Sequence, residues 1–378
     1  MPSVPPLTDI YFYITGRCNL QCSHCWISAG EEPSPDSELS TEEVRDIIDQ
    51  AIPLGLRAIK ITGGEPFMRD DIVDILEYAA SKGLRSRVET NGTLLEDETI
   101  ERLARIDGFQ ACVSLDGATP ETHAKLRGSR AVYHSTVRAL EALAKNGVPT
   151  QIITVVHKGN VDEIEDITAM ADELGIGLHK INQLNSMGRG TEMVEAGEAL
   201  SIEEVLEFNH FVEDHLNVKY STAVRFDIPI VFQSPDIIRK FASSYCSIQN
   251  ILGVLSDGRL SICGIGEEIE ELIFANVHGA TVREVWEGNK TLIAIRRDVE
   301  SEREGLCQRC MLKKYCMGGY CRAFAYARYG SFRAPYPFCQ DSFDAGLFPA
   351  FRLLDSGSTP SRREARFTPP YASGCWQL

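Results

Sequence analysis

The sequence predicts an α/β fold: a partial (β/α)6 TIM-like barrel of six strand–helix units, followed by a small cysteine-rich domain. Three observations predict this fold. Short β-branched runs alternate with segments of helical period between residue 11 and about residue 215. Seven of the twelve cysteines lie between residues 246 and 339. The chain has 378 residues, which is enough for one large domain and a smaller one.

The first part of the chain contains six predicted strands, each a short run rich in β-branched or aromatic residues. Six such units in series predict a parallel sheet whose ligand site lies at the carboxyl ends of the strands. Because a closed barrel of this kind needs eight strands, we expect an open or partial barrel. The runs are residues 10–15, 58–62, 85–90, 111–115, 151–156 and 177–181.

The segments between these runs carry the signals of helix ends. Ser40 and Glu43 form a capping-box pattern ahead of a run of apolar residues at helical spacing. Three further segments end in glycine, which favours the left-handed conformation that terminates many helices. These glycines are Gly83, Gly147 and Gly175.

The alternation breaks down after about residue 217, and this change predicts the domain organisation. Loop-rich, cysteine-rich sequence suggests a part of the chain that metal organises in place of a large apolar core. The tail is rich in Ser, Pro and Arg, and we expect it to be poorly ordered unless it docks. The predicted units are the barrel at 1–217, a bridging segment at 218–245, the cysteine-rich domain at 246–345 and the tail at 346–378.

Charge and composition exclude several classes of partner. The formal net charge of −16 leaves no basic face for a phosphate backbone, so no nucleic-acid partner is expected. No apolar run is long enough to span a bilayer and no secretory signal precedes the first strand, so we expect a cytoplasmic protein without a membrane partner. In a reducing compartment, clustered thiols more often hold metal or do redox chemistry than form disulfides.

Three cysteines, Cys18, Cys22 and Cys25, follow the first predicted strand and therefore lie at the ligand-binding end of the sheet. Three thiolates on a four-iron cluster leave one iron free to bind a substrate or a cofactor. The alternative is a zinc site that His24 or a distant residue completes.

A second motif, "ITGGEP", follows the second strand. Gly63 and Gly64 allow a close backbone approach to a ligand, and Glu65 offers a carboxylate to an ammonium group. Alone this motif is weak, because turns between strands and helices often carry glycines. It is far more informative one unit after a loop with three cysteines.

The CxxxCxxC spacing and the GGEP motif together resemble the radical S-adenosylmethionine superfamily, over about residues 8–217. The resemblance implies a 4Fe-4S cluster on the three cysteines, with S-adenosylmethionine bound to its free iron. It also implies reductive cleavage of S-adenosylmethionine to a 5′-deoxyadenosyl radical that abstracts hydrogen from the substrate. An electron donor such as flavodoxin or ferredoxin would then be a partner.

The same resemblance implies roles for residues at the strand ends. His24 would pack beside the adenine, Gly63 and Gly64 would belong to the cofactor-binding turn, and Glu65 would hold the methionyl ammonium. Arg127 is the candidate for the cofactor carboxylate. The residues expected near the sugar and methionyl parts are Thr90, Asn91, Ser114 and Asp116.

Some of these positions also have a simpler interpretation. Ser114, Asp116 and Arg127 could provide turn chemistry and a solvated charge at strand ends. The glycine-rich segment at 185–190 is interpreted as a loop without a catalytic role, with an anion contact by Arg189 as the alternative.

The later cysteines resemble the seven-cysteine SPASM extension of radical S-adenosylmethionine enzymes, which implies one or two auxiliary 4Fe-4S clusters. Four residues separate Cys316 from Cys321, where the family has three. One or two zinc-ribbon sites are the alternative. The resemblance implies one cluster on Cys307, Cys310, Cys316 and Cys339, and another on Cys246, Cys263 and Cys321.

The SPASM resemblance implies a peptide or protein substrate. We therefore expect a maturase that modifies a ribosomally made peptide by crosslinking, thioether formation, epimerisation or oxidation. Because the first cluster cysteine is residue 18, no room precedes it for a leader-binding domain, so a separate leader-binding protein could be a partner.

Four alternatives stay open. The compact layout is similar to anaerobic sulfatase maturases, which oxidise a protein side chain. The sequence around "RCNLQCSHCW" resembles radical enzymes of alternative haem biosynthesis, which act on a tetrapyrrole. An iron–sulfur electron carrier would have no use for GGEP and would not cleave S-adenosylmethionine. A zinc-ribbon interaction protein would contain zinc and no iron.

Overall fold

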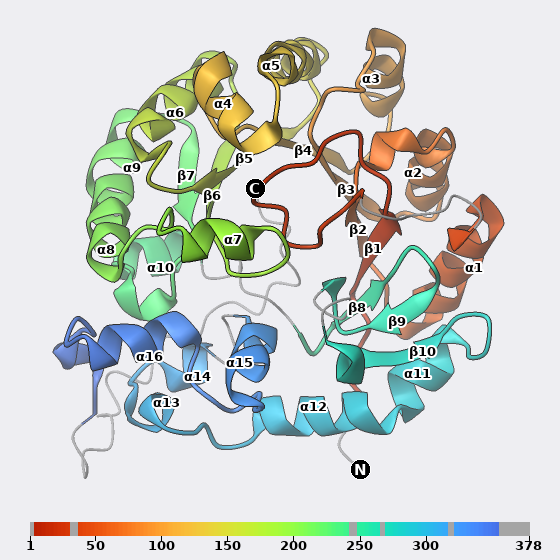
Figure 1. Cartoon of the computed structure of the whole chain (residues 1–378). Helices are drawn as coiled ribbons and strands as arrows, with labels where there is room; N and C mark the ends of the chain where they lie inside the picture. Colours follow the sequence, from red (N-terminus) through yellow and green to blue (C-terminus); the bar gives the residue numbers. More distant parts are fainter. Residues whose placement is uncertain (1–3, 31–36, 242–247, 265–268, 317–320, 355–378) are drawn as a thin grey trace.

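A computed structural model describes residues 4–30, 37–241, 248–264, 269–316 and 321–354 of the chain (Figure 1). Within these residues, ten strands form one sheet in the order β10-β9-β8-β1-β2-β3-β4-β5-β6-β7. The strands are β1 (Asp9–Thr15), β2 (Ala58–Gly63), β3 (Arg85–Thr90), β4 (Phe109–Ser114), β5 (Thr150–Val156), β6 (Leu178–Gln183), β7 (Ala223–Phe226), β8 (Ile251–Val254), β9 (Arg259–Ser261) and β10 (Ile273–Asn276).

Strands β1 to β7 are all parallel, which confirms the predicted α/β fold with an open parallel barrel. All six predicted strands are present. The seventh, β7, lies in the stretch predicted to bridge the two domains, and its four residues are too few to show a clear pattern. Helices cover the outside of the sheet (Figure 1): α1 (Thr41–Ala51), α2 (Ile72–Ser81), α3 (Asp97–Leu103), α4 (Pro120–Arg127), α5 (Arg130–Lys145), α6 (Ile164–Glu173) and α8 (Ile202–Phe211).

The predicted helix ends are confirmed. Ser40 caps α1 through a reciprocal pair of hydrogen bonds with Glu43, which satisfies backbone donors that the first helical turn leaves free. Gly83, Gly147 and Gly175 have φ angles of 74°, 69° and 67°, the left-handed region that glycine enters without strain.

Side chains alternate between the two faces of each strand, and this alternation separates the core from the site. In β2, Ile59 and Ile61 are buried in the hydrophobic core. Lys60 and Thr62 on the other face line a cavity inside the barrel. The core therefore lies between the sheet and the helices, and the inner face carries polar groups.

The cysteine-rich part of the chain continues the same sheet. Strand β8 pairs in parallel with β1, with Leu252 opposite Ile10, and β9 and β10 follow as antiparallel neighbours. Trp286 is buried in the barrel's core and donates its indole N–H to the Pro5 carbonyl at 2.8 Å. The two predicted domains thus share one sheet and one core in the described residues.

The last helices run from one edge of the sheet to the other (Figure 1). Helix α11 (Val282–Gly288) packs against α1 at the β10 end of the sheet, and α12 (Lys290–Glu300) follows it. Helix α16 (Pro337–Asp344) packs against α8 near the β7 edge, where Phe338 contacts Phe232. Between them lie α13 (Leu306–Arg309), α14 (Lys313–Cys316) and α15 (Arg322–Tyr329).

Among the helices that the structure describes, none is both long and apolar enough to cross a lipid bilayer.

We predict that the Leu252→Ala substitution lowers the free energy of unfolding by about 2–5 kcal/mol, because Leu252 is fully buried in the shared core. Urea denaturation under anaerobic conditions measures this change, and loss of barrel and cysteine-rich structure should occur in one transition. The control is Ile293→Ala on α12, where the side chain is 45% exposed and the change should be small. A separate early transition for the cysteine-rich part would contradict a shared sheet.

Candidate active site

A cavity of about 430 Å³ opens at the carboxyl ends of the strands and collects most of the residues predicted from the sequence. It is lined from the barrel by side chains that follow β1 to β6 and from the other side by the cysteine-rich part. The predicted site residues in its wall are Cys18, Cys22, His24, Cys25, Gly63, Gly64, Glu65, Thr90, Asn91, Ser114, Arg127, Cys263 and Cys321. Of the remaining candidates, Asp116 is fully buried behind the wall, and Cys246 lies outside the described residues.

Residues 16–30, here called the cysteine loop, pack directly on the turn after β2. The N–H groups of Gly64 and Glu65 donate to the carbonyls of Thr15 and Arg17 at 2.7 and 2.8 Å. A Cβ atom on Gly64 would lie 1.9 Å from the Arg17 carbonyl oxygen, and Gly63 has a φ of 114°. Gly64 is therefore required by the close approach of the cysteine loop and Gly63 by that of the end of β1, although both residues also line the cavity.

Arg189 fixes the other side of the cysteine loop. Its backbone N–H donates to the Cys25 carbonyl and its Nε to the Cys22 carbonyl, both at 2.9 Å. Its two Nη atoms donate to the Ala29 carbonyl at 3.2 Å. This role of Arg189 was not predicted from the sequence, which favours a loop without a catalytic role at residues 185–190. The glycines on both sides of Arg189 permit close packing, and they could have indicated that this segment contacts another loop.

Glu65 is held in one orientation at the cavity wall. The side chain is 1% exposed, and its carboxylate accepts hydrogen bonds from Thr90 Oγ1 at 2.7 Å and from the Asn91 N–H at 2.8 Å. Burial raises the pKa of Glu65, and these hydrogen bonds act against that rise. Thr90 and Asn91 thus position Glu65 as well as lining the cavity.

Asp116 and Arg127 form a buried ion pair, with Arg127 Nε 2.7 Å from Asp116 Oδ2. Asp116 also accepts from the Val155 N–H at 2.8 Å. Burial alone would raise the pKa of Asp116, but the Arg127 guanidinium, together with nearby histidines and the Val155 N–H, holds the pKa well below its ordinary value. Arg127 Nη1 lies 3.6 Å from Cys22 Sγ, so the pair places a cation beside the cysteine loop.

His24 is a neutral imidazole at the wall of the cavity. Burial lowers the pKa of His24 to about 4, and its Nε2 lies 3.8 Å from Asp116 Oδ2. Its Nδ1 is buried and has no hydrogen-bond partner within the described part of the chain. A flat, uncharged ring with a polar edge suits contact with a nucleobase, so we propose that His24 keeps its predicted place beside the adenine.

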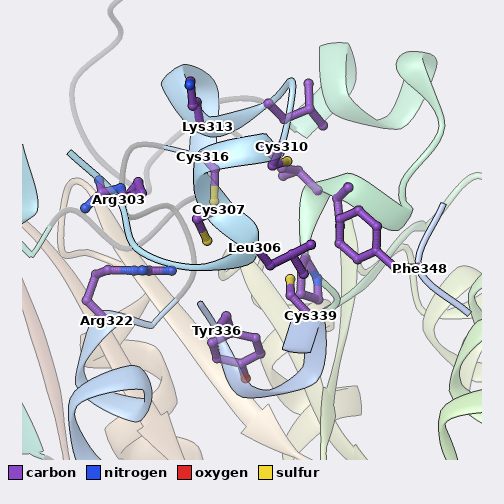
Figure 2. A pocket seen from close by; sticks show the side chains of 14 residues that line it. Arg303, Leu306, Cys307, Cys310, Lys313, Cys316, Arg322, Tyr336, Cys339 and Phe348 are labelled. Atoms are coloured by element: carbon purple, nitrogen blue, oxygen red, sulfur yellow. The ribbon is translucent and has the colours of Figure 1, made fainter. Parts of the chain in front are cut away.

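A second pocket lies among α13, α14 and α16, and Figure 2 shows sulfur atoms on several sides of it. Four of the residues that line it are cysteines, two from α13 and its C-terminal cap and one each from α14 and α16. Burial raises the pKa of Cys310 to about 11 and that of Cys339 well above its ordinary value. Iron binding would release these protons, because thiolates are the ligands of iron–sulfur clusters. The four are Cys307, Cys310, Cys316 and Cys339, the set predicted to hold one auxiliary cluster.

Two guanidinium groups face this pocket (Figure 2). Arg322 is 2% exposed and donates to the Ala334 carbonyl at 2.7 Å. Its charge favours the thiolate forms of Cys307 and Cys339, against the larger rise in pKa that burial causes. Arg303 also lines the pocket, and its buried Nη1 has no hydrogen-bond partner in the described residues. The pocket therefore combines four thiols with positive charge, as a cluster with excess negative charge requires.

Cys263 and Cys321 lie apart from that pocket and face the main cavity. Burial raises the pKa of Cys321 to about 12. A Cβ atom on Gly264 would lie within 2.0 Å of the Tyr13 ring, so the chain after Cys263 packs tightly on β1. We propose that these two cysteines, with Cys246, hold a second auxiliary cluster beside the substrate.

Comparison with known proteins gives two family matches and several relatives. A model described as the Radical SAM superfamily matches residues 12–171, and one described as the SPASM iron–sulfur cluster-binding domain matches residues 246–311. Both predicted resemblances are thereby confirmed. So are S-adenosylmethionine and 4Fe-4S clusters as cofactors, since these domains indicate both.

The relatives differ in how much of the chain they match. An AdoMet-dependent heme synthase of Methanosarcina barkeri is 33% identical over 351 residues, 90% of this chain and 97% of the relative. An Fe-coproporphyrin III synthase of the same organism is 27% identical over 352 residues, 87% of each chain. The mycofactocin maturase MftC of Mycobacterium ulcerans is 37% identical, over 183 residues and 48% of each chain.

Among solved structures, SuiB of Streptococcus suis bound to S-adenosylmethionine superposes with a TM-score of 0.71. The match covers 89% of this chain and 78% of SuiB at 19% identity, and it shows a shared fold.

We predict that Asp116→Asn weakens S-adenosylmethionine binding about 10- to 100-fold, because Arg127 loses the charged partner that orients it. Equilibrium binding to the anaerobically reconstituted enzyme measures this effect, with iron content checked to be unchanged. Glu121→Gln is the matched control, since it removes the carboxylate of an exposed pair with Arg130. Equal affinities in Asp116→Asn and the wild type would contradict the proposed role of Arg127.

A second prediction concerns the auxiliary pocket. Replacing Arg303 with Gln removes a cation from its wall and should make the midpoint potential of the auxiliary cluster more negative, because the cation stabilises the reduced cluster. We expect at least about a tenfold change in the ratio of reduced to oxidised cluster, about 59 mV for one electron. A redox titration followed by electron paramagnetic resonance measures it, with the exposed Arg297→Gln as control. An unchanged potential would show that Arg303 does not act on the cluster.

Proposed function

We propose that this chain, which belongs to the radical S-adenosylmethionine superfamily and carries a SPASM domain, modifies an iron porphyrin in a haem-forming reaction. The coverage of the relatives carries this proposal. Likeness to the heme synthase extends over 90% of the chain, including its cysteine-rich part. Likeness to the mycofactocin maturase is confined to about half of the chain.

The resemblance to haem-pathway enzymes around "RCNLQCSHCW" is therefore favoured over the peptide maturase that the SPASM spacing implies. In the sequence, the seven later cysteines favour a peptide substrate, because the SPASM enzymes that they resemble mostly modify peptides. Two relatives that match 90% and 87% of the chain are named for tetrapyrrole products, which supports a tetrapyrrole substrate.

The lining of the main cavity suits a flat, largely apolar ring. Several apolar side chains share the wall with the polar residues described above, and aromatic groups among them offer faces on which a ring can stack. The rest of the wall is largely polar, so the ring can lie on the apolar side chains while its polar substituents meet the polar residues. These residues are Trp26, Ile153, Val155, Leu184 and Phe324.

When bound, the clusters and S-adenosylmethionine supply one-electron chemistry and a radical that abstracts hydrogen. A porphyrin propionate becomes a vinyl group by losing one hydrogen atom, then carbon dioxide and one electron. That change needs a one-electron acceptor, and iron–sulfur clusters belong to this class of group. The chain's own residues orient the side chain to be attacked and exclude water from the radical.

We propose matching tasks for the described residues. Glu65, fixed by Thr90 and Asn91, would bind the methionyl ammonium, and Arg127, fixed by Asp116, would bind the methionyl carboxylate. Cys18, Cys22 and Cys25 would hold the radical-generating cluster. The wall formed by Cys263, Cys321 and Phe324 would face the substrate.

The test is anaerobic incubation of the reconstituted enzyme with iron-coproporphyrin III, S-adenosylmethionine and dithionite, followed by mass spectrometry. Each converted side chain should lower the porphyrin mass by one carbon, two oxygens and two hydrogens, with 5′-deoxyadenosine formed in parallel. A Cys22→Ala variant should form neither product, because it lacks one ligand of the radical cluster. Formation of 5′-deoxyadenosine with no change in the porphyrin would count against the proposal.

A peptide substrate is the second candidate, which the 37% identity to a mycofactocin maturase over 48% of the chain favours. If a precursor peptide lost two hydrogens or carbon dioxide in the same assay, while the porphyrin stayed intact, this second candidate would replace the first.

A further inference from the structure

The lysine and arginine side chains that line the main cavity are paired with carboxylates of the chain, apart from one. Lys60 Nζ lies 2.6 Å from Glu89 Oε1, and Thr62 donates to the other oxygen of Glu89 at 2.9 Å. Arg127 is paired with Asp116, as described above. Each of these cations thus has a carboxylate of the chain within direct contact.

Lys180 is the exception. It lines the cavity from β6, and its ammonium makes no ion pair or hydrogen bond with any residue that the structure describes. The charged groups that face it are Asp227 and Glu89, which favour its charge, and Arg225 and Lys60, which oppose it. Burial lowers the pKa of Lys180, so the site disfavours the free ammonium and favours a ligand that supplies the opposite charge.

Strand register places Lys180 level with Ser114. Ser114, Ile153 and Lys180 are direct partners in neighbouring strands, so they form one row across β4, β5 and β6. Two strand spacings separate the Cα atoms of Ser114 and Lys180, about 10 Å. Lys180 and Ser114 therefore line the same stretch of wall on β4 to β6, whereas the cysteine loop and Glu65 follow β1 and β2.

Asn182 stands on the same face of β6, two residues further toward the carboxyl end. Its side chain lines the cavity, and its Oδ1 is buried without a hydrogen-bond partner in the described residues. Turning this amide by 180° would present its NH2 to the same ligand atom that Lys180 attracts. An ammonium with a neighbouring amide forms a site for a carboxylate.

We propose that Lys180, assisted by Asn182, binds a propionate carboxylate of the porphyrin and so orients the ring in the cavity. This inference rests on the proposed function. The methionyl carboxylate of S-adenosylmethionine has a different proposed partner, Arg127, whose Nη1 lies 3.6 Å from Cys22 Sγ on the side of the cysteine loop. Lys180 is thus a specificity residue for substrates with anionic side chains.

The experiment compares two probes that differ only in charge: iron-coproporphyrin III, with four propionates, and its tetramethyl ester. Each is titrated into anaerobically reconstituted enzyme and followed by porphyrin absorbance. The wild type should bind the acid at least tenfold more tightly than the ester. Lys180→Met should lose this preference, with affinity for the ester unchanged, and Lys180→Arg should restore it.

Two controls separate this role from a structural one. Lys145→Met removes an exposed lysine at the end of α5 and should leave all affinities unchanged. Lys180→Met should unfold at the same temperature as the wild type or higher, because it removes an unpaired charge from a cavity. Its affinity for S-adenosylmethionine should not change.

The possible outcomes are distinct. If Lys180→Met binds the acid as tightly as the wild type, or if it weakens acid and ester equally while lowering the unfolding temperature, the carboxylate site is overturned and the proposed function stands. If the wild type binds the ester as tightly as the acid, the carboxylate site is likewise wrong. If the wild type binds neither porphyrin, the proposed function fails and this inference falls with it.

Discussion

The contact between the turn after β2 and the cysteine loop is the constraint on which the centre of the molecule depends. Gly64 has no Cβ, so the Arg17 carbonyl can accept from the neighbouring Glu65 N–H at 2.8 Å. The same contact places two functional groups at once. It sets the three cysteines at the cavity wall and turns Glu65 toward Thr90 and Asn91, which hold its carboxylate.

Around this contact, most buried cations of the barrel are paired with carboxylates, and the position of each pair distinguishes one side of the cavity from the other. The Asp116–Arg127 pair lies near the cysteine loop, and the Lys60–Glu89 pair lies inside the sheet. Unpaired charge inside a protein is costly, so the chain retains it only where a ligand can offset that cost. Within the described residues, Lys180 and Arg303 are such places. Under our proposal, the Arg127 side of the cavity binds S-adenosylmethionine and Lys180 is left for the substrate.

Patterns that act over short distances could be predicted from the sequence. The six strands, the capping box at Ser40 and the cysteine spacings all depend on residues within a few positions of one another. Contacts between distant segments could not. The pairing of β8 with β1 joins residues more than 200 positions apart, and Arg189 reaches back to Cys22. Asp116 was predicted to contact the cofactor, but its burial behind Arg127 becomes visible only once β4, β5 and α4 are packed together.

We propose that three separate sets of cysteines each hold an iron–sulfur cluster. The most direct measurement is iron and sulfide per chain after anaerobic reconstitution, for the wild type and for the variant with Cys18, Cys22 and Cys25 all changed to Ala. Three four-iron clusters predict about twelve irons in the wild type and about eight in the variant. About eight irons in the wild type falling to about four would mean a single auxiliary cluster. That result would contradict the assignment of Cys263 and Cys321 to a cluster beside the substrate.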